Sequence, residues 1–344
     1  MLTKGKVLLL SLIVIYALLP SCKPNADQEQ KQPPVVIDTT PIGKQLAEVS
    51  RKIAQNPNDA SLYNLRAQLH LKRNDIANAG MDITQTLQLD STKAEYYLTA
   101  SDVNLAGGQP GKSVVALQKA IELDPKNIKA KEKLAELYFI AMQYDKSIQE
   151  LDNILRIDIH DAKAYFMKGM NFKEKGDTNR AVGSFQTAIE QRSDYYEPYV
   201  QLALIYTAQA NKLAMQYYDG ALRLNPKSEE ALYGRGMYYQ EVVNDYDKAI
   251  QDYTSITLIN PKSFNAYFNL GFIHYQYLKV YGEAIKHYSK AIEYAPNWPE
   301  AYFNRGLTFE TSGDIARAKV DYQKAIELRP DYEKAKIALA RVGK

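Results

Sequence analysis

The hexapeptide Ala120-Ile121-Glu122-Leu123-Asp124-Pro125 recurs almost unchanged as Ala291-Ile292-Glu293-Tyr294-Ala295-Pro296 and as Ala325-Ile326-Glu327-Leu328-Arg329-Pro330. Each copy ends an apolar helical segment at a turn. Corresponding turns follow one another at intervals of 33 to 35 residues, at Pro57, Ser91, Pro125, Ile159, Ser193, Pro226, Pro261, Pro296 and Pro330. A period of this length indicates a solenoid, in which one supersecondary unit is stacked many times.

Two positions of this repeat hold only small residues. Position 8 is Ala67, Ser101, Ala135, Gly169, Ala203, Gly236, Gly271 and Gly306, and position 20 is Ala79, Ser113, Ser147, Ala181, Ala214, Ala249, Ala284 and Ala318. Helices that cross closely need small side chains at the crossing point, because a larger one forces them apart. Each repeat is therefore predicted to be a pair of packed helices, A and B, joined by a turn.

The period and the two small positions resemble the tetratricopeptide repeat (TPR). The resemblance covers residues 60–332 and divides them into eight repeats, at 60–93, 94–127, 128–161, 162–195, 196–228, 229–263, 264–298 and 299–332. It implies an all-α fold, an α-solenoid of helix-turn-helix repeats that forms a right-handed superhelix. Position 27, usually alanine in the family, is Thr86, Ile154 or Ile256 in three repeats. The turn near Asn244 is one residue longer than the family's usual turn.

Both ends of a solenoid need caps, because a repeat cannot bury its apolar face alone. Residues 42–59 are predicted to form an N-terminal capping helix with an inner stripe of Leu46, Val49 and Ile53. Residues 333–344 are predicted to form the C-terminal capping helix, with its lysines outward and an inner stripe of Ile337, Leu339 and Ala340. The chain also has 27 tyrosines, and many of them fall at positions 4, 11 and 24, which indicates packing between neighbouring helices.

Residues 1–21 have the features of a bacterial export signal. Lys4 and Lys6 precede an apolar run, Val7–Leu19, that is short for a membrane span. The run ends at Leu19-Pro20-Ser21-Cys22, which resembles the lipobox of bacterial lipoproteins, where the cysteine after the cleavage site takes a diacylglycerol. The alternatives are an uncleaved anchor and a signal with an incidental thiol. Acylation of Cys22, the only cysteine, would tether the mature chain to a membrane.

Residues 22–41 are polar, contain prolines and show no helical period, so they are predicted to form the acylated cysteine and a flexible tether. The resemblance to lipoproteins implies attachment to the outer membrane of a bacterial envelope. The residue after Cys22 is lysine, whereas aspartate retains lipoproteins in the inner membrane of enteric bacteria. Whether the chain lies on the periplasmic face or on the cell surface stays open.

Composition and motifs disfavour several other functions. Hydrophobic residues make up 46% and charged residues 24%, the balance of a folded protein, and a net charge of +3 without a concentrated basic face disfavours a nucleic-acid partner. Residues 106–113 fit a loosened nucleotide-binding pattern, but they follow a predicted helix rather than a strand, so no nucleotide is expected. The four histidines lack zinc-ligand spacing, and no nucleophile motif is present. We therefore expect no enzyme activity, cofactor or metal.

In the family, positions 2, 5, 6, 9 and 12 of helix A face a concave groove and meet the ligand. In repeats 1–3 the groove is polar or charged, with Asp102, Lys129, Glu132, Lys133 and Glu136. In repeats 4–8 these positions form an apolar stripe with two asparagines, which is the predicted partner-binding groove: Phe166, Met170, Leu204, Tyr233, Met237, Phe268, Asn269, Phe272, Phe303, Asn304 and Leu307. An exposed apolar stripe marks a surface for a protein or peptide. The alternative is that these side chains pack between adjacent A helices or are covered by the tether.

Together these features predict a membrane-anchored scaffold or adaptor that binds a protein partner in its groove, within a bacterial envelope assembly or secretion complex. A second possibility is a surface glycan-binding lipoprotein of the SusD-like type. Those proteins carry long insertions that build the sugar site, whereas the turns of this chain vary by a single residue.

Overall fold

The structure, a computed structural model, describes residues 40–343. The predicted leader, Cys22 and nearly all of the predicted tether lie outside the described residues. The described chain forms eighteen α-helices and one short π-helix, beginning with α1 (Pro41–Gln55) and ending with α18 (Glu333–Val342). The prediction of an all-α solenoid of paired helices is confirmed.

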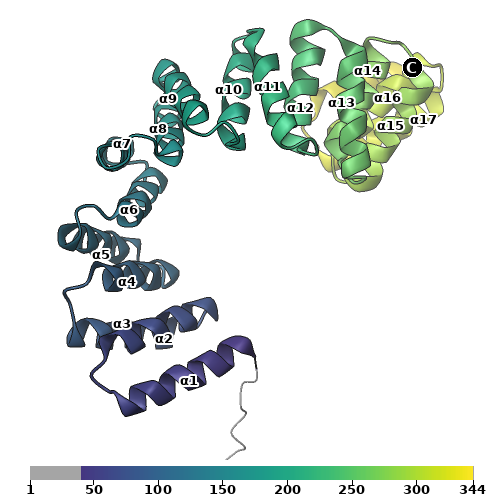
Figure 1. The fold of residues 1–344 in the computed structure, drawn as a ribbon. Helices are drawn as coiled ribbons and strands as arrows, with labels where there is room; N and C mark the ends of the chain where they lie inside the picture. The colour runs from purple at the N-terminus through teal and green to yellow at the C-terminus, as the bar shows by residue number, and fades with distance from the viewer. Residues whose placement is uncertain (1–39, 344) are drawn as a thin grey trace, which may run out of the picture.

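Between α1 and α18 the helices form pairs, and each pair is one repeat. The pairs are α2 (Ala60–Lys72) with α3 (Ile76–Leu89), α4 (Ala94–Ala106) with α5 (Pro110–Leu123), α6 (Ile128–Ile140) with α7 (Tyr144–Leu155), α8 (Ala162–Glu174) with α9 (Thr178–Gln191), α10 (Tyr196–Ala208) with α11 (Leu213–Leu224), α12 (Glu229–Tyr238) with α13 (Tyr246–Ile259), α14 (Phe264–Gln276) with α15 (Tyr281–Tyr294), and α16 (Pro299–Thr311) with α17 (Ile315–Leu328). Figure 1 shows the pairs following one another along an open, curved array. All the extensive contacts join helices that are at most two places apart in the chain.

The turn between helix A and helix B has the same backbone feature in every repeat. One residue of each turn adopts the left-handed conformation: Asn74, Gly108, Met142, Gly176, Ala210, Asn244, Lys279 and Gly313. Glycine does so without strain, whereas most other residues lose about 1 kcal/mol there. Residues 106–113, which fit the loosened nucleotide-binding pattern, contain this turn between α4 and α5.

The small residue at position 8 makes room for a ring from helix B of the same repeat. A Cβ atom added to Gly271 would lie 2.8 Å from Cδ1 of Tyr288, whose side chain is fully buried. The same arrangement pairs Gly169 with Phe185, Gly236 with Tyr253, and Gly306 with Tyr322. In repeats 1–3, where position 8 is Ala or Ser, the residue at position 24 is aliphatic: Ile83, Leu117 and Leu151. The prediction that the position-24 tyrosines are packing residues is confirmed.

Three repeats contain a buried ion pair between helix A and helix B. In repeat 8, Arg305 donates from Nε to Oδ2 of Asp321 and from Nη2 to Oδ1, both at 2.8 Å, and Asp321 is only 3% exposed. Equivalent pairs join Arg66 to Asp82 and Arg235 to Asp252. Two parallel hydrogen bonds between charged groups fix the relative position of the two helices.

The extra residue of repeat 6 is accommodated at the end of its helix A. There α12 continues into a π-helix, η1 (Tyr239–Val243), which ends at Asn244 in the left-handed conformation. A π-turn takes one residue more than an α-turn, so the insertion lengthens the helix end. Gln240, buried on this turn, accepts a hydrogen bond from the Tyr253 hydroxyl at 3.3 Å.

The two terminal helices cap the stack in different ways. α1 buries the predicted stripe of Leu46, Val49 and Ile53. In α18 the prediction for Ile337 and Ala340 is wrong, because Ile337 is 64% exposed and Ala340 is exposed as well. α18 instead approaches α16 and α17 with Ala335 and Ala338 buried and Leu339 half-buried. Alanine at the crossing point allows a closer approach than a larger side chain does.

Repeat 7 carries His287 where the ion-paired repeats carry an aspartate. Its ring centroid lies 5.2 Å from that of His274, and its Nε2 lies 3.8 Å from Oε2 of Glu283. Burial, assisted by the neighbouring His274 and Lys286, lowers the pKa of His287 to about 4, although the Glu283 carboxylate acts in the opposite direction. The folded chain therefore keeps His287 neutral at pH values where the unfolded chain protonates it.

This histidine is expected to make stability depend on pH. Between the ordinary pKa of 6.5 and the folded value of about 4, only the unfolded chain takes up the proton, so the free energy of unfolding falls as the pH falls. We expect a loss of about 2 kcal/mol between pH 7.5 and pH 5 in urea unfolding, which His287→Leu should remove. An unchanged pH dependence in the variant would show that the folded chain also binds the proton.

Candidate functional site

The A helices lie on the inner side of the curved array. A helices of neighbouring repeats contact one another directly, as α2 with α4, α10 with α12 and α14 with α16 do, and no two B helices in residues 40–343 are packed as closely. The elements on the concave side of a curved stack are the ones drawn together. The concave surface of this chain is therefore built from A helices, as the TPR resemblance implies.

The predicted partner-binding groove runs along the A helices of repeats 4–8, on α8, α10, α12, α14 and α16. Most of its side chains are half-buried. Leu204 is the most open of them, with 37% of its surface exposed, and Asn269 is the most enclosed, with 8%. The stripe is thus neither a sealed core nor a row of fully exposed side chains, and its outer parts form a shallow apolar surface.

The position-5 rings of this stripe also hold the repeats together. Phe268 packs against Tyr288 of helix B, with ring centroids 5.5 Å apart, and against Trp298, at 4.4 Å. Phe166 lies in the same way between Phe185 and Tyr195, and Phe303 lies between Tyr322 and Tyr332. Trp298 and its two counterparts each directly precede the next A helix or α18. The inner faces of these rings therefore pack within the stack.

The two asparagines of the stripe are oriented by internal hydrogen bonds. Nδ2 of Asn269 donates to Oη of Tyr233 at 3.1 Å, and Nδ2 of Asn304 donates to the backbone carbonyl of Glu300 at 2.8 Å. An amide side chain has two N–H donors and a carbonyl acceptor. Nδ2 of Asn269 also donates to Sδ of Met237 at 3.7 Å. Internal hydrogen bonds from Nδ2 thus orient both asparagine side chains.

The charges at the polar end of the groove pair with one another. Nζ of Lys133 lies 2.5 Å from Oδ1 of Asp102, and Nζ of Lys163 lies 3.1 Å from Oε1 of Glu136 and 3.6 Å from Oε2 of Glu132. Each of these pairs joins the A helices of two neighbouring repeats. The acids of the polar end are therefore already matched by lysines within the chain.

Two adjoining hollows lie on the inner surface of repeats 5–7. The first, which we call the acidic hollow, has a volume of about 310 Å³ and is lined by Leu204, Glu229, Glu230, Tyr233, Ile256 and Asn265 among others. The second, which we call the aromatic hollow, has a volume of about 500 Å³ and is lined mainly by Phe264, Asn265, Pro296 and Trp298. Both are recesses in which side chains of a partner could be held. Position 2 of helix A supplies residues to both hollows.

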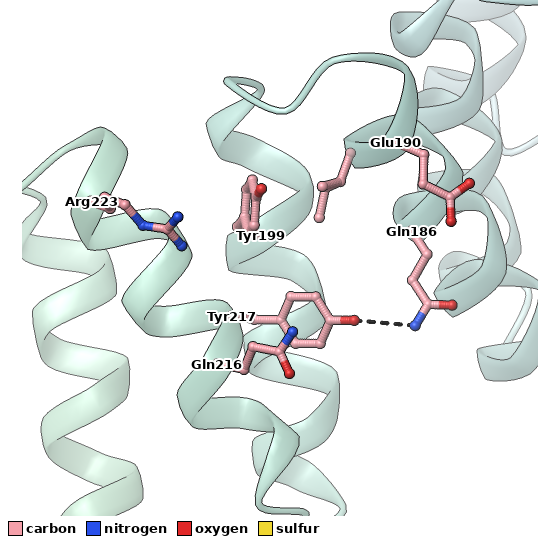
Figure 2. A pocket seen from close by; sticks show the side chains of 7 residues that line it. Gln186, Glu190, Tyr199, Gln216, Tyr217 and Arg223 are labelled. Carbon is pink, nitrogen blue, oxygen red and sulfur yellow. Dashed lines mark hydrogen bonds between the residues drawn. The ribbon is translucent and has the colours of Figure 1, made fainter.

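A third hollow, of about 390 Å³, lies between α9, α10 and α11, away from the stripe. Figure 2 shows the hydrogen bond across it, in which Nε2 of Gln186 donates to Oη of Tyr217 at 3.1 Å. Tyr199 from α10 and the charged Glu190 and Arg223 complete its lining. No motif marks these residues in the sequence, because they meet only when repeats 4 and 5 are stacked.

Known family models match four segments of the chain. Models described as tetratricopeptide repeat match residues 94–127, 162–195 and 299–332, and one described as TPR repeat matches residues 279–313. The chain contains tetratricopeptide repeats. The first three ranges are those of repeats 2, 4 and 8 as delimited from the sequence.

Curated relatives match parts of this TPR protein. Human tetratricopeptide repeat protein 13 is 25% identical over 135 residues, which make up 38% of this chain and 16% of the human protein. The BBSome complex member BBS4 of Bos taurus is 26% identical over 144 residues, 42% of this chain and 27% of that protein. This chain thus spans a small part of the length of these relatives.

Solved structures share the fold of this TPR protein. The C-terminal part of a TPR repeat-containing protein from Cytophaga hutchinsonii has a TM-score of 0.57 at 19% identity, covering 65% of this chain and 93% of that one. PilF of Pseudomonas aeruginosa has a TM-score of 0.51 at 15% identity, covering 64% of this chain and 96% of that one. At such identities the likeness shows the fold alone.

TPR domains bind protein or peptide partners, and TPR proteins are typically non-enzymatic scaffolds. Among residues 40–343, no helix has the length and apolar character needed to cross a membrane. In the same part of the chain, no three His, Cys, Asp or Glu side chains are grouped so that they could hold a metal ion. Because TPR domains bind protein or peptide partners, the surface of the A helices is the candidate site for a protein partner.

Proposed function

We propose that this TPR protein is a lipid-anchored scaffold that holds a protein partner on the A helices of repeats 4–8, within a bacterial envelope assembly or secretion complex. The observation that carries the proposal is the half-exposed apolar stripe on the inner side of the array. A protein seldom leaves a continuous apolar surface to water unless that surface binds something. The anchor is inferred from Cys22, which directly follows the apolar leader, and the outer-membrane location from the lipoprotein resemblance.

The contrast between the two ends of the groove favours the C-terminal half as the binding half. The acids of the polar end are paired with lysines, whereas the stripe has apolar surface that no part of residues 40–343 covers fully. Met170 and Met237 in the stripe are flexible side chains that adapt to a partner's shape. A glycan ligand is supported less well, because no inserted loop accompanies the short turns between the described helices.

The groove is tested best at stripe residues that contribute less to the stack than Phe268 does. The ring of Phe272 meets that of Tyr277, at the end of its own helix. Leu204→Ala combined with Phe272→Ala should weaken binding about 30-fold, because truncating central apolar anchors typically costs about 2 kcal/mol of binding free energy. Phe268 is less suitable, since its ring packs against Trp298. The partner is first identified by crosslinking and affinity capture from native membranes, and its affinity for each purified variant is then measured.

The matched control lies at the polar end. Glu132→Ala combined with Glu136→Ala removes two exposed or half-exposed groove side chains from the same kind of helix, and we expect it to change the affinity less than about threefold. Melting temperatures show that both variants are folded. If the polar-end variant loses the partner and the stripe variant keeps it, the binding half is assigned wrongly.

The anchor is tested at Cys22. Cys22→Ser removes the thiol that takes the diacylglycerol, so the chain should accumulate as an unprocessed precursor without attached lipid. Mass spectrometry of the purified chain and partition into a detergent phase measure both effects. A variant that is still processed, and still partitions with lipoproteins, would rule out the lipid anchor.

A further inference from the structure

The inner surface of repeats 5 and 6 carries carboxylates that have no counter-charge in the described chain. Glu197 and Glu230 occupy position 2 of adjacent repeats, both are exposed, and neither forms an ion pair or a hydrogen bond through its carboxylate within residues 40–343. The only cation of α12 is Arg235, whose guanidinium is held by Asp252 and Asp219. The acids of this surface are therefore free to meet a charge from outside.

The other end of the same groove is built differently. There the acids Asp102, Glu132 and Glu136 each lie within ion-pair distance of a lysine from the next repeat. The chain thus supplies counter-charges in repeats 2–4 and leaves them out in repeats 5 and 6. Unpaired charge on a binding surface selects a partner of opposite charge and guides its approach.

The acidic hollow has the lining that a long cationic side chain requires. Glu229 and Glu230 line it together with the apolar side chains Leu204 and Ile256 and the ring of Tyr233. Glu229 accepts a single hydrogen bond, from Nδ2 of Asn260 at 3.2 Å. Lysine and arginine lay their aliphatic stems along apolar surface while the charged head meets polar groups, and an aromatic ring adds attraction for the cation. A hollow of about 310 Å³ accommodates such a side chain.

The aromatic hollow beside it fits a large apolar side chain. The rings of Phe264 and Trp298 meet edge to face in its wall, with centroids 5.3 Å apart, and Phe264 is 36% exposed. Asn265 lines both hollows. Two side chains that occupy the hollows together must therefore be close in the partner, for example on one face of an extended segment, where alternate residues lie about 7 Å apart.

We infer that repeats 5–7 bind a segment of the protein partner that carries a lysine or arginine near a large apolar side chain. The inference rests on the proposed function, since it specifies the chemistry of the partner for the same groove. The cationic head meets Glu229 and Glu230, and the apolar side chain contacts Phe264 and Trp298.

The test measures the binding of three pools of fluorescent 12-residue peptides to the purified full-length protein. All pools have degenerate uncharged positions, and the first fixes Arg and Leu two residues apart. The second replaces the Arg by Glu, and the third replaces the Leu by Ser. We expect the first pool to bind at least tenfold more tightly than the other two, because a charge-assisted contact and an apolar anchor are each worth about that factor. Binding should weaken between 50 and 500 mM NaCl.

The variant Glu229→Gln with Glu230→Gln should bind the first pool at least tenfold more weakly than the unmodified chain does, and Phe264→Ala should erase the preference for Leu over Ser. The matched control is Glu293→Gln with Glu327→Gln, which removes two exposed acids from B helices and should change binding less than about twofold. Equal binding of the first two pools, or no effect of the Glu229/Glu230 variant, overturns the inference. The proposed function survives that result if Leu204→Ala with Phe272→Ala still releases the captured partner.

Discussion

Replacing Gly271 by leucine is expected to lower the free energy of unfolding by about 3 kcal/mol, because it overfills a closely packed helix crossing. A Cβ atom at this position would already lie 2.8 Å from the ring of Tyr288, closer than side-chain atoms pack in proteins. Tyr288 is fully buried and packs against Phe268, so its ring has little room to move aside. Thermal and urea unfolding followed by circular dichroism measure the loss.

A second glycine of the same repeat provides the control. Nothing lies within 4 Å of a Cβ atom added to Gly282, so Gly282→Ala should raise stability by about 0.5–1 kcal/mol, as alanine does in a helix. Gly271→Ala combined with Tyr288→Leu copies the Ala135 and Leu151 pairing of repeat 3. This double variant should keep most of the free energy of unfolding of the unmodified chain. An unchanged melting temperature in Gly271→Leu would show that the helices do not meet at position 8.

The second large effect is expected at the buried ion pair of repeat 8. Asp321→Ala leaves the Arg305 guanidinium with only Ser289 as a side-chain hydrogen-bond partner, at 3.0 Å, in a largely buried site. Removing one partner of a buried ion pair costs about 3–5 kcal/mol, since the remaining charge has lost its counter-charge. Because Arg305 keeps 21% of its side chain exposed, we expect a loss near 3 kcal/mol in urea unfolding.

Two comparisons separate the buried charge from a general effect of mutation. Glu327→Ala breaks an exposed pair with Lys324 on the same helix and should cost less than about 1 kcal/mol. Arg305→Leu with Asp321→Leu removes both charges and should cost less than Asp321→Ala alone, since no charge is left unpaired. If Asp321→Ala is no worse than Glu327→Ala, the pair contributes little to stability.

Periodic spacing was sufficient to predict most of this fold. The two small positions predicted the helix crossings, and the stripe of α1 predicted its buried face. The same reasoning was wrong for Ile337 and Ala340. The last helix, α18, has apolar residues on more than one face, and hydrophobicity alone does not say that the face with Ala335 and Ala338 is the one that α16 and α17 cover. The ion pairs were visible in principle as arginine and aspartate about 16 residues apart in three repeats.

The sequence was sufficient to predict which repeat positions line the candidate groove, but not how far each of those side chains is buried. A helical wheel places Phe268 on the groove side, yet it cannot show that Trp298, from the turn before the next helix, covers one part of that ring. The recurrence of an aromatic residue directly before an A helix or α18, at Tyr195, Trp298 and Tyr332, is the signal from which this packing could have been predicted. The acidic hollow was not predictable, because its lining comes from repeats 5, 6 and 7. The aromatic hollow was not predictable either, because it forms where the two ends of repeat 7 meet.

The absence of extensive contacts between helices more than two places apart has a mechanical consequence. When the two ends of the described array are pulled apart, each interface between repeats turns by a small angle and none has to separate, so the array extends as a coil spring does. Small rotations add along the stack and change its curvature, which lets the inner surface match the length of what it holds. A partner lying across repeats 4–8 would link those repeats to one another and stiffen residues 162–332. Repeats 1–3 would stay flexible.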